Sequence, residues 1–189
     1  MDLISNTNAY LEINLGPMFS GKTSKLIEIY KKYKYCKIDV LPINHENDNR
    51  YDDTLLSSHN KIMIPCIKIS RLLDIDSEVL LKHQVILINE GQFFSDLVEF
   101  VHKMLFLKKK IYIFGLDGDF ERKKFGNILD LIPLCDSVYK LHSLCGICKT
   151  GRRAIFSKRV TNETSQVLVG SDNYIPSCRE CYDNQSNIS

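Results

Sequence analysis

The fold is decided by the stretch Gly16-Pro17-Met18-Phe19-Ser20-Gly21-Lys22-Thr23, which fits the phosphate-loop pattern G-x-x-x-x-G-K-[ST]. The apolar run 10–15 before it predicts a strand, and the apolar spacing after it predicts a helix over 23–33. In such a loop the backbone N–H groups wrap a polyphosphate, Lys22 reaches the outer phosphates and Thr23 contacts Mg²⁺. A chance Gly/Lys-rich turn is the alternative, but the expected strand-loop-helix context favours a nucleotide-binding loop.

Outward from this loop, apolar runs alternate with helical patterns as far as residue 141. Strands are predicted at 10–15, 37–43, 84–88, 111–116 and 137–141, and helices at 23–33, 69–82 and 96–107. The segment 45–61 is polar enough to be a long mobile loop. This alternation is typical of an α/β fold of the P-loop NTPase type, with a mostly parallel sheet and flanking helices. We expect residues 1–141 to form the nucleotide-binding domain.

Composition narrows the class of protein. The chain has 189 residues, 44% of them hydrophobic, so it can bury a core and is neither disordered nor collagen-like. A net charge of +2 is far below the basic surplus of a protein held mainly to nucleic acid, so no nucleic-acid partner is expected. No apolar run is long enough to span a membrane, and the first residues lack the pattern of a signal peptide. We therefore expect a cytoplasmic protein with no membrane partner.

Two further strand ends should face the phosphate loop, because ligands bind at the carboxyl ends of strands in an open parallel sheet. Asn89 stands where a Walker-type site normally has an aspartate, and it could still offer an oxygen to Mg²⁺. Glu90 is the nearest carboxylate, either a metal-shell ligand or a general base, unless it is only a solvated loop residue. Phe93, Phe120 and Phe125 in neighbouring loops suggest an apolar slot for a planar base, although single aromatics are more often core residues.

Four cysteines form two C-x-x-C pairs, Cys145 with Cys148 and Cys178 with Cys181. Two such pairs are typical of a structural zinc site, since four protein ligands leave no open position for a substrate. A redox pair beside a coincidental second pair is the alternative. We expect a small zinc-ribbon domain over 142–182 and a flexible tail over 183–189. The remaining cysteines, at 36, 66 and 135, are expected in the core.

Taken together with Lys158-Arg159, these motifs resemble those of the cellular- and poxvirus-type (type II) thymidine kinases over residues 10–182. The resemblance implies transfer of the γ-phosphate of ATP to the 5′-hydroxyl of thymidine, a deoxynucleoside salvage step that gives dTMP for DNA synthesis. It implies that Glu90 is the general base, that Lys22 and Thr23 hold phosphate and Mg²⁺, and that Arg159 lies near the reacting phosphates. Asn89 departs from the aspartate that this family usually has before the catalytic glutamate.

The resemblance also implies how thymidine is bound. A lasso loop over 161–174, tied down by the zinc site, would offer backbone groups to the thymine edge. Those groups belong to Val167, Leu168, Val169 and Gly170. The matching apolar pocket positions are Met18, Leu116, Phe120, Phe125 and Tyr174, to which we add Phe93. Asp48-Asn49-Arg50-Tyr51 resembles the D-x-R-Y stretch of the family. The resemblance further implies feedback inhibition by dTTP and a homotetramer.

Two other functions stay open at this point. Asn89 could leave a nucleotide-binding homologue with weakened activity. The chain could instead be a P-loop ATPase or GTPase whose zinc ribbon acts on a protein or nucleic-acid partner. The near-neutral charge counts against a nucleic-acid partner, and the phenylalanines near the strand ends favour a small base as co-substrate.

Overall fold

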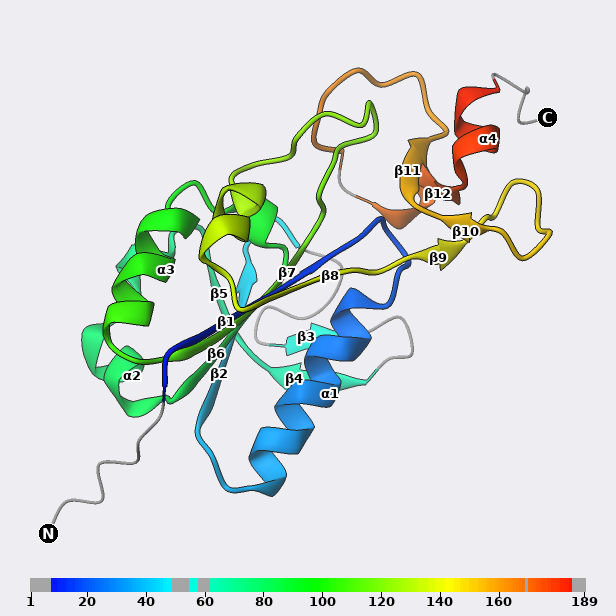
Figure 1. Ribbon diagram of the computed structural model, residues 1–189. Helices are drawn as coiled ribbons and strands as arrows, with labels where there is room; N and C mark the ends of the chain where they lie inside the picture. Colours follow the sequence, from blue (N-terminus) through cyan, green and yellow to red (C-terminus); the bar gives the residue numbers. More distant parts are fainter. Residues whose placement is uncertain (1–7, 49–54, 58–61, 169, 185–189) are drawn as a thin grey trace, which may run out of the picture.

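The computed structural model describes residues 8–48, 55–57, 62–168 and 170–184, and a six-stranded sheet forms its centre (Figure 1). All neighbouring strands in this sheet are parallel. Their order is β5 (Ile67–Ile69), β2 (Val40–His45), β6 (Val85–Ile88), β7 (Lys110–Gly115), β1 (Tyr10–Leu15) and β8 (Ser137–Lys140). The predicted α/β class is confirmed, and the five predicted strands lie within three residues of the observed ones.

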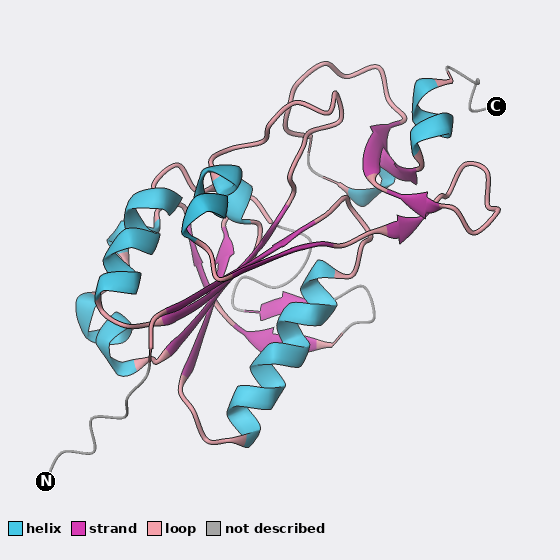
Figure 2. Cartoon of the chain, in the orientation of Figure 1, coloured by secondary structure: helices cyan, strands magenta, loops and turns pink. Residues whose placement is uncertain are grey.

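Helices cover both faces of the sheet, as Figure 2 shows. The helix α1 (Lys22–Tyr35) lies on one face, and α3 (Leu97–Phe106), α2 (Ser77–Lys82) and the 3₁₀ helix η3 (Ile128–Leu134) lie on the other. Strand β6 is buried throughout because Val85 and Leu87 pack under α1 while Ile86 and Ile88 pack under α3. A strand buried on both faces is continuously apolar, which is why this one was readable from sequence.

Two sequence predictions on this part of the chain are wrong. The expected helix over 69–82 is reduced to the short helix α2, which follows the end of strand β5 at Ile69 and a 3₁₀ turn η1 (Leu72–Asp74). Asp76 starts that short helix, since its carboxylate accepts the backbone N–H of Glu78 at 2.8 Å. The expected loop over 45–61 contains β3 (Leu55–Ser57), which pairs with β4 (Met63–Pro65) beside α1. Residues 49–54 and 58–61 lie outside the described part of the chain.

The cysteines outside the C-x-x-C pairs differ from one another in burial. Cys36 is exposed at the end of α1, so its predicted core position is wrong. Cys66 and Cys135 are partly buried and pack against the two core clusters. Burial raises the pKa of the Cys66 thiol to about 11. Cys66 therefore lacks the lowered pKa of a reactive thiolate.

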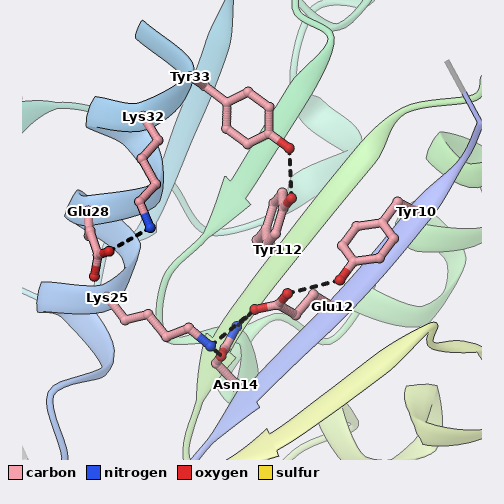
Figure 3. A network of polar contacts seen from close by, with 8 residues as sticks. All are labelled: Tyr10, Glu12, Asn14, Lys25, Glu28, Lys32, Tyr33 and Tyr112. Carbon is pink, nitrogen blue, oxygen red and sulfur yellow. Dashed lines mark hydrogen bonds and ion pairs between the residues drawn. The ribbon is translucent and has the colours of Figure 1, made fainter. Parts of the chain in front are cut away.

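A polar network fixes α1 on the strand that leads into the phosphate loop (Figure 3). The ammonium group of Lys25 lies 2.5 Å from Asn14 Oδ1 and 3.2 Å from Glu12 Oε1. Glu12, which is buried, also accepts a hydrogen bond from the hydroxyl of Tyr10 at 3.0 Å. Because α1 begins at Lys22, the same contacts set the position of the residues that would meet phosphate.

Beyond β8 the chain forms a small unit of short strands at one end of the sheet (Figure 1). Strand β9 (Ser143–Leu144) pairs with β10 (Arg153–Ala154), and β11 (Phe156–Arg159) pairs with β12 (Tyr174–Ser177). A short helix, α4 (Arg179–Asp183), follows. Within the described residues no helix combines the length and apolar character needed to cross a membrane.

Candidate active site

The phosphate loop joins β1 to α1, as the sequence predicted. Gly21 precedes the helix with a φ of 82°, in the left-handed region where glycine is favoured. Residues 18–23 line a cavity, and Gly16 and Pro17 lie buried behind them. The Lys22 ammonium donates hydrogen bonds to the carbonyl oxygens of Gly16 at 3.0 Å and Pro17 at 2.7 Å. The loop thus keeps its lysine folded against its own backbone, beside the cavity.

Glu90 reaches the same cavity from the end of β6. It has a φ of 51°, and the turn η2 (Gly91–Phe93) begins immediately after it. The buried side chain of Gln92 donates to Glu90 Oε2 at 2.7 Å and accepts the backbone N–H of Leu116 at 3.0 Å. The sequence did not predict this role of Gln92, which holds the Glu90 carboxylate and the next strand end in one arrangement. A non-glycine residue at positive φ beside a cavity is a frequent feature of functional sites.

Asn89 lies behind the cavity wall rather than on it. It is 2% exposed, and its amide donates to Asn44 Oδ1 at 3.0 Å. Asn44 in turn donates to Asp48 Oδ2 at 3.0 Å, and Asp48 does line the cavity. The predicted contact between Asn89 and Mg²⁺ stays a prediction. The rest of the predicted D-x-R-Y stretch, residues 49–51, lies outside the described residues.

Aromatic and aliphatic side chains form the apolar part of the cavity lining. They are Met18 of the phosphate loop and, from other segments, Phe93, Leu116, Phe120, Phe125 and Tyr174. The rings of Phe93 and Phe125 meet edge to face with centroids 5.5 Å apart. Gly126 has a φ of 60°, and a Cβ atom there would lie 2.0 Å from the carbonyl oxygen of Gln92. The loop that carries Phe120 and Phe125 therefore passes directly against the turn that follows Glu90.

The predicted lasso supplies Val167, Leu168 and Gly170 to the cavity, while Val169 lies outside the described residues. Its position is set by Arg159, whose guanidinium donates to the carbonyl oxygens of residues 163 (2.9 Å), 165 and 166 (3.3 Å). The same group donates to the hydroxyl of Tyr174 at 2.5 Å and lies 3.7 Å from the ring centre of Phe120.

Arg159 thus makes contacts that the family resemblance did not imply. It is 9% exposed, and it is not among the described residues that line the cavity. Its Nη1 and Nη2 atoms donate hydrogen bonds to lasso carbonyl oxygens, and its Nε has no hydrogen-bond partner in the described structure. Proximity of Arg159 to reacting phosphates stays a prediction, and these contacts favour a role in holding the lasso.

The four cysteines of the C-x-x-C pairs come together, with their sulfur atoms all within 4.8 Å of one another. Four thiolates around zinc, at a Zn–S distance of about 2.3 Å, lie roughly 3.8 Å apart, so this donor set fits a tetrahedral zinc ion. Burial alone would raise the pKa of Cys145, but backbone N–H groups of Cys148, Cys178 and Ile147 outweigh it and lower the pKa below that of an ordinary thiol. A thiolate-forming cysteine suits metal binding.

Several further residues line the cavity without a role predicted from sequence. Besides Gln92, these are Ser24, Asn47, Gly118, Asp119, Ser157 and Gln166. The hydroxyl of Ser157 accepts the backbone N–H of Met18 at 2.9 Å, so strand β11 is hydrogen-bonded to the phosphate loop. The only sequence signal for Ser157 was its place directly before Lys158-Arg159.

Comparisons with known proteins agree with this geometry. A family model described as "Thymidine kinase" matches residues 9–182. The chain is 41% identical to a thymidine kinase of variola virus over 174 residues, which cover 92% of this chain and 96% of that protein. Thymidine kinases of vaccinia virus (strain Tian Tan, 40% identity, 92% and 96% covered) and myxoma virus (strain Uriarra, 39%, 91% and 95%) are also similar.

Proposed function

Because the chain belongs to the thymidine kinase family, we propose that it is the enzyme that transfers the γ-phosphate of ATP to the 5′-hydroxyl of thymidine, giving dTMP. One observation carries the assignment of the site: a single cavity is bordered by the phosphate loop, by Glu90 and by the apolar and lasso residues. The family match extends over the lasso and both cysteine pairs. It does not favour a P-loop ATPase or GTPase with a zinc ribbon.

On the ATP side, residues 16–23 form the phosphate site and Lys22 moves from its carbonyl partners onto the transferred phosphate. The lysine side chain is already beside the cavity, so this change needs only rotation about its own bonds. Thr23 would hold Mg²⁺, which would supply positive charge beside the phosphates of ATP. The backbone N–H groups of the loop and the N-terminus of α1 stabilise the remaining negative charge.

Glu90 acts as the general base that takes the proton of the 5′-hydroxyl. Its carboxylate borders the cavity, and its hydrogen bond from Gln92 limits where that carboxylate can point. A base must lie within hydrogen-bond reach of the proton it removes, so a fixed carboxylate favours one orientation of the sugar.

Asp48 supplies the negative charge that Asn89 lacks. The hydrogen-bonded chain from Asn89 through Asn44 to Asp48 runs from the end of β6 to the cavity. Asn89 orients Asn44, which in turn holds Asp48. Asp48 contributes the negative charge near the Mg²⁺ site. This arrangement supports an active enzyme and not a homologue weakened by Asn89.

On the thymidine side, the base occupies the apolar slot and the lasso backbone at residues 167–170 meets its polar edge. Arg159 positions the lasso rather than touching phosphate, since its contacts are with lasso carbonyl groups and Tyr174. The cysteine cluster binds one structural zinc ion, which holds the ends of the unit from which the lasso projects.

Four further properties extend the family resemblance. Residues 1–141 and 142–182 act as two domains, followed by a tail at 183–189. The enzyme works in the cytoplasm, where seven cysteines would remain reduced, in keeping with the free cysteines of the structure. dTTP inhibits it, since thymine and a triphosphate together would span both sides of the cavity. A homotetramer is supported by the edge strand β8, where Val138 and Tyr139 are about half exposed.

The test is release of ADP from ATP with and without thymidine. We expect release that depends on thymidine, and nucleoside-independent hydrolysis would favour the ATPase reading. Glu90→Gln should keep nucleotide binding and lower kcat by roughly 10²–10⁴-fold, the loss typical of a missing general base. Glu99→Gln, on an exposed position of α3, is the matched control. Near-normal turnover in Glu90→Gln would remove this residue from the mechanism.

A further inference from the structure

We propose that Asp119 and Gln166 form the latch that closes the lasso over the nucleoside, so that both are positioning residues for the thymidine reaction. The Gln166 amide donates a hydrogen bond to Asp119 Oδ2 at 2.8 Å. Forty-seven residues separate the two in sequence, and both border the cavity. This inference rests on the proposed function, because it concerns how the same cavity is closed.

The Asp119 side of the latch is rigid. Asp119 is 7% exposed, and its Oδ1 accepts the backbone N–H groups of Glu121 and Lys123, each at 2.9 Å. The backbone N–H of Asp119 also donates to the carbonyl of Lys123 at 2.9 Å. One oxygen therefore fixes the turn of the loop that carries Phe120, and the other is left facing the lasso.

The Gln166 side joins the lasso to two parts of the molecule at once. Its side chain reaches the body through Asp119, and its carbonyl oxygen accepts a hydrogen bond from Arg159 at 3.3 Å. Val167 and Leu168, which follow it directly, line the cavity. A residue held at both its side chain and its backbone sets the path of the two residues that come next.

Other contacts tie the C-terminal unit to the body without involving this stretch of lasso. Arg122 pairs with Asp183 at 2.6 Å, and the hydroxyl of Tyr182 donates to the carbonyl of Phe120. These contacts hold helix α4, so they keep the unit docked when the latch is broken. Loss of the latch should therefore loosen the lasso without releasing the whole unit.

The effect should fall on thymidine and spare ATP. A hydrogen bond to a charged group is worth about a tenfold change in an equilibrium or more. Gln166→Glu replaces the donor with a second carboxylate opposite Asp119. We expect the KM for thymidine to rise about tenfold, with the KM for ATP unchanged, and amide hydrogen exchange to accelerate severalfold in residues 163–168 without ligand.

Swapping the carboxylate and the amide between positions 119 and 166 tests whether the two side chains act as a pair or whether each has only a structural role of its own. Asp119→Asn alone should raise the KM for thymidine less than Gln166→Glu does. An amide at 119 can still accept from the loop and can donate to the Gln166 oxygen if the Gln166 amide flips, but that bond is no longer charge-assisted. The double variant Asp119→Asn/Gln166→Glu should regain wild-type exchange and KM, since the new amide donates to the new carboxylate. Thr164→Glu adds the same charge at an exposed lasso position and is the control.

The hydrogen-exchange measurement keeps this inference distinct from the proposed function. If wild-type protein showed no thymidine-dependent reaction, exchange in residues 163–168 would still report the latch. Unchanged exchange and KM in Gln166→Glu, an equal effect in Thr164→Glu, or no recovery in the double variant would each overturn the proposal.

Discussion

The two sides of the cavity are held in place by different kinds of contact. The phosphate loop and Glu90 extend from β1 and β6, which are buried in the apolar cores under α1 and α3. No described residue of the lasso belongs to an apolar core cluster, and the lasso is held by the Arg159 guanidinium, the Asp119–Gln166 hydrogen bond and the paired strands β11 and β12 on either side of it. Packing therefore fixes the catalytic side, and a few polar contacts fix the side that covers the nucleoside.

Because the two sides are held by different contacts, we expect variants on one side to affect mainly stability and variants on the other to affect mainly thymidine binding. A side chain in the packed core contacts many neighbours, so its loss lowers the free energy of unfolding of the whole domain. Loss of one polar anchor in the lasso should change the affinity for thymidine long before the sheet unfolds. Variants on the two sides can therefore be compared by whether unfolding or the KM for thymidine responds.

The largest effect is expected where the two sides meet, at Gly126. In Gly126→Ala the new Cβ would be driven into the Gln92 carbonyl, and the residue would also keep an unfavourable φ of 60°. Left-handed strain of about 1–2 kcal/mol and overpacking of about 1–3 kcal/mol should add. We expect a lower Tm and poor thymidine binding together, measured by thermal unfolding and steady-state kinetics.

Gly151 provides the matched control. It also has a positive φ, of 79°, but a Cβ there would have no atom within 4 Å. Gly151→Ala should show the strain alone and leave the KM for thymidine unchanged. Equal losses in the two variants would mean that the contact between the Gly126 loop and the turn after Glu90 does not matter.

The next effect is expected at Arg159. Arg159→Ala removes the donors to three lasso carbonyl groups, and hydrogen bonds from a charged group are worth about 1.5–3 kcal/mol. The KM for thymidine should rise roughly 10- to 100-fold while kcat at saturation changes little. Arg159→Lys should resemble the alanine variant, because one ammonium cannot replace the planar fork.

The exposed Arg153 on β10 is the control for this prediction, and Arg153→Ala should keep wild-type kinetics. A large fall in kcat with an unchanged KM for thymidine would point instead to contact between Arg159 and the reacting phosphates, as the family resemblance implied.

The smallest effect is a pH dependence of the packed side. Burial lowers the pKa of His45 below its ordinary 6.5, and its ring nitrogen Nδ1 lies 3.1 Å from the backbone N of Asn47, which donates to it. Below about pH 6.5 the unfolded chain binds a proton that the folded chain resists, so stability should fall as pH decreases from 6.5. Urea unfolding between pH 7.5 and 5.5 should show a shallower decline in His45→Gln. Parallel declines in the two proteins would exclude His45 as a source.

The same contrast explains what could be predicted from sequence. The strands and the phosphate loop were readable because buried parallel strands are apolar runs and the loop motif has fixed spacing. The cysteine cluster was readable because the two C-x-x-C pairs also have a fixed spacing. The roles of Asp119, Gln166 and Gln92 were not readable, since each acts through a partner that only the fold brings near.

Misplaced elements have a similar cause. The predicted helix over 69–82 begins at the last residue of the edge strand β5 and includes the capping residue Asp76, so only its last part is helical. Asn89 follows a strand end as expected, but its amide turns towards Asn44. A side chain's direction at a strand end depends on its neighbours, which one sequence does not reveal.

Removal of zinc tests the central claim most directly. Purified protein should contain about one zinc ion per chain, and a chelator should extract it under conditions where the sheet stays folded. We predict faster hydrogen exchange across residues 161–174 and a higher KM for thymidine, with exchange in β1, β6 and α3 and the KM for ATP unchanged. Simultaneous loss of protection in the sheet and the lasso, or an unchanged KM for thymidine in zinc-free protein, would contradict the view that the two sides are held independently.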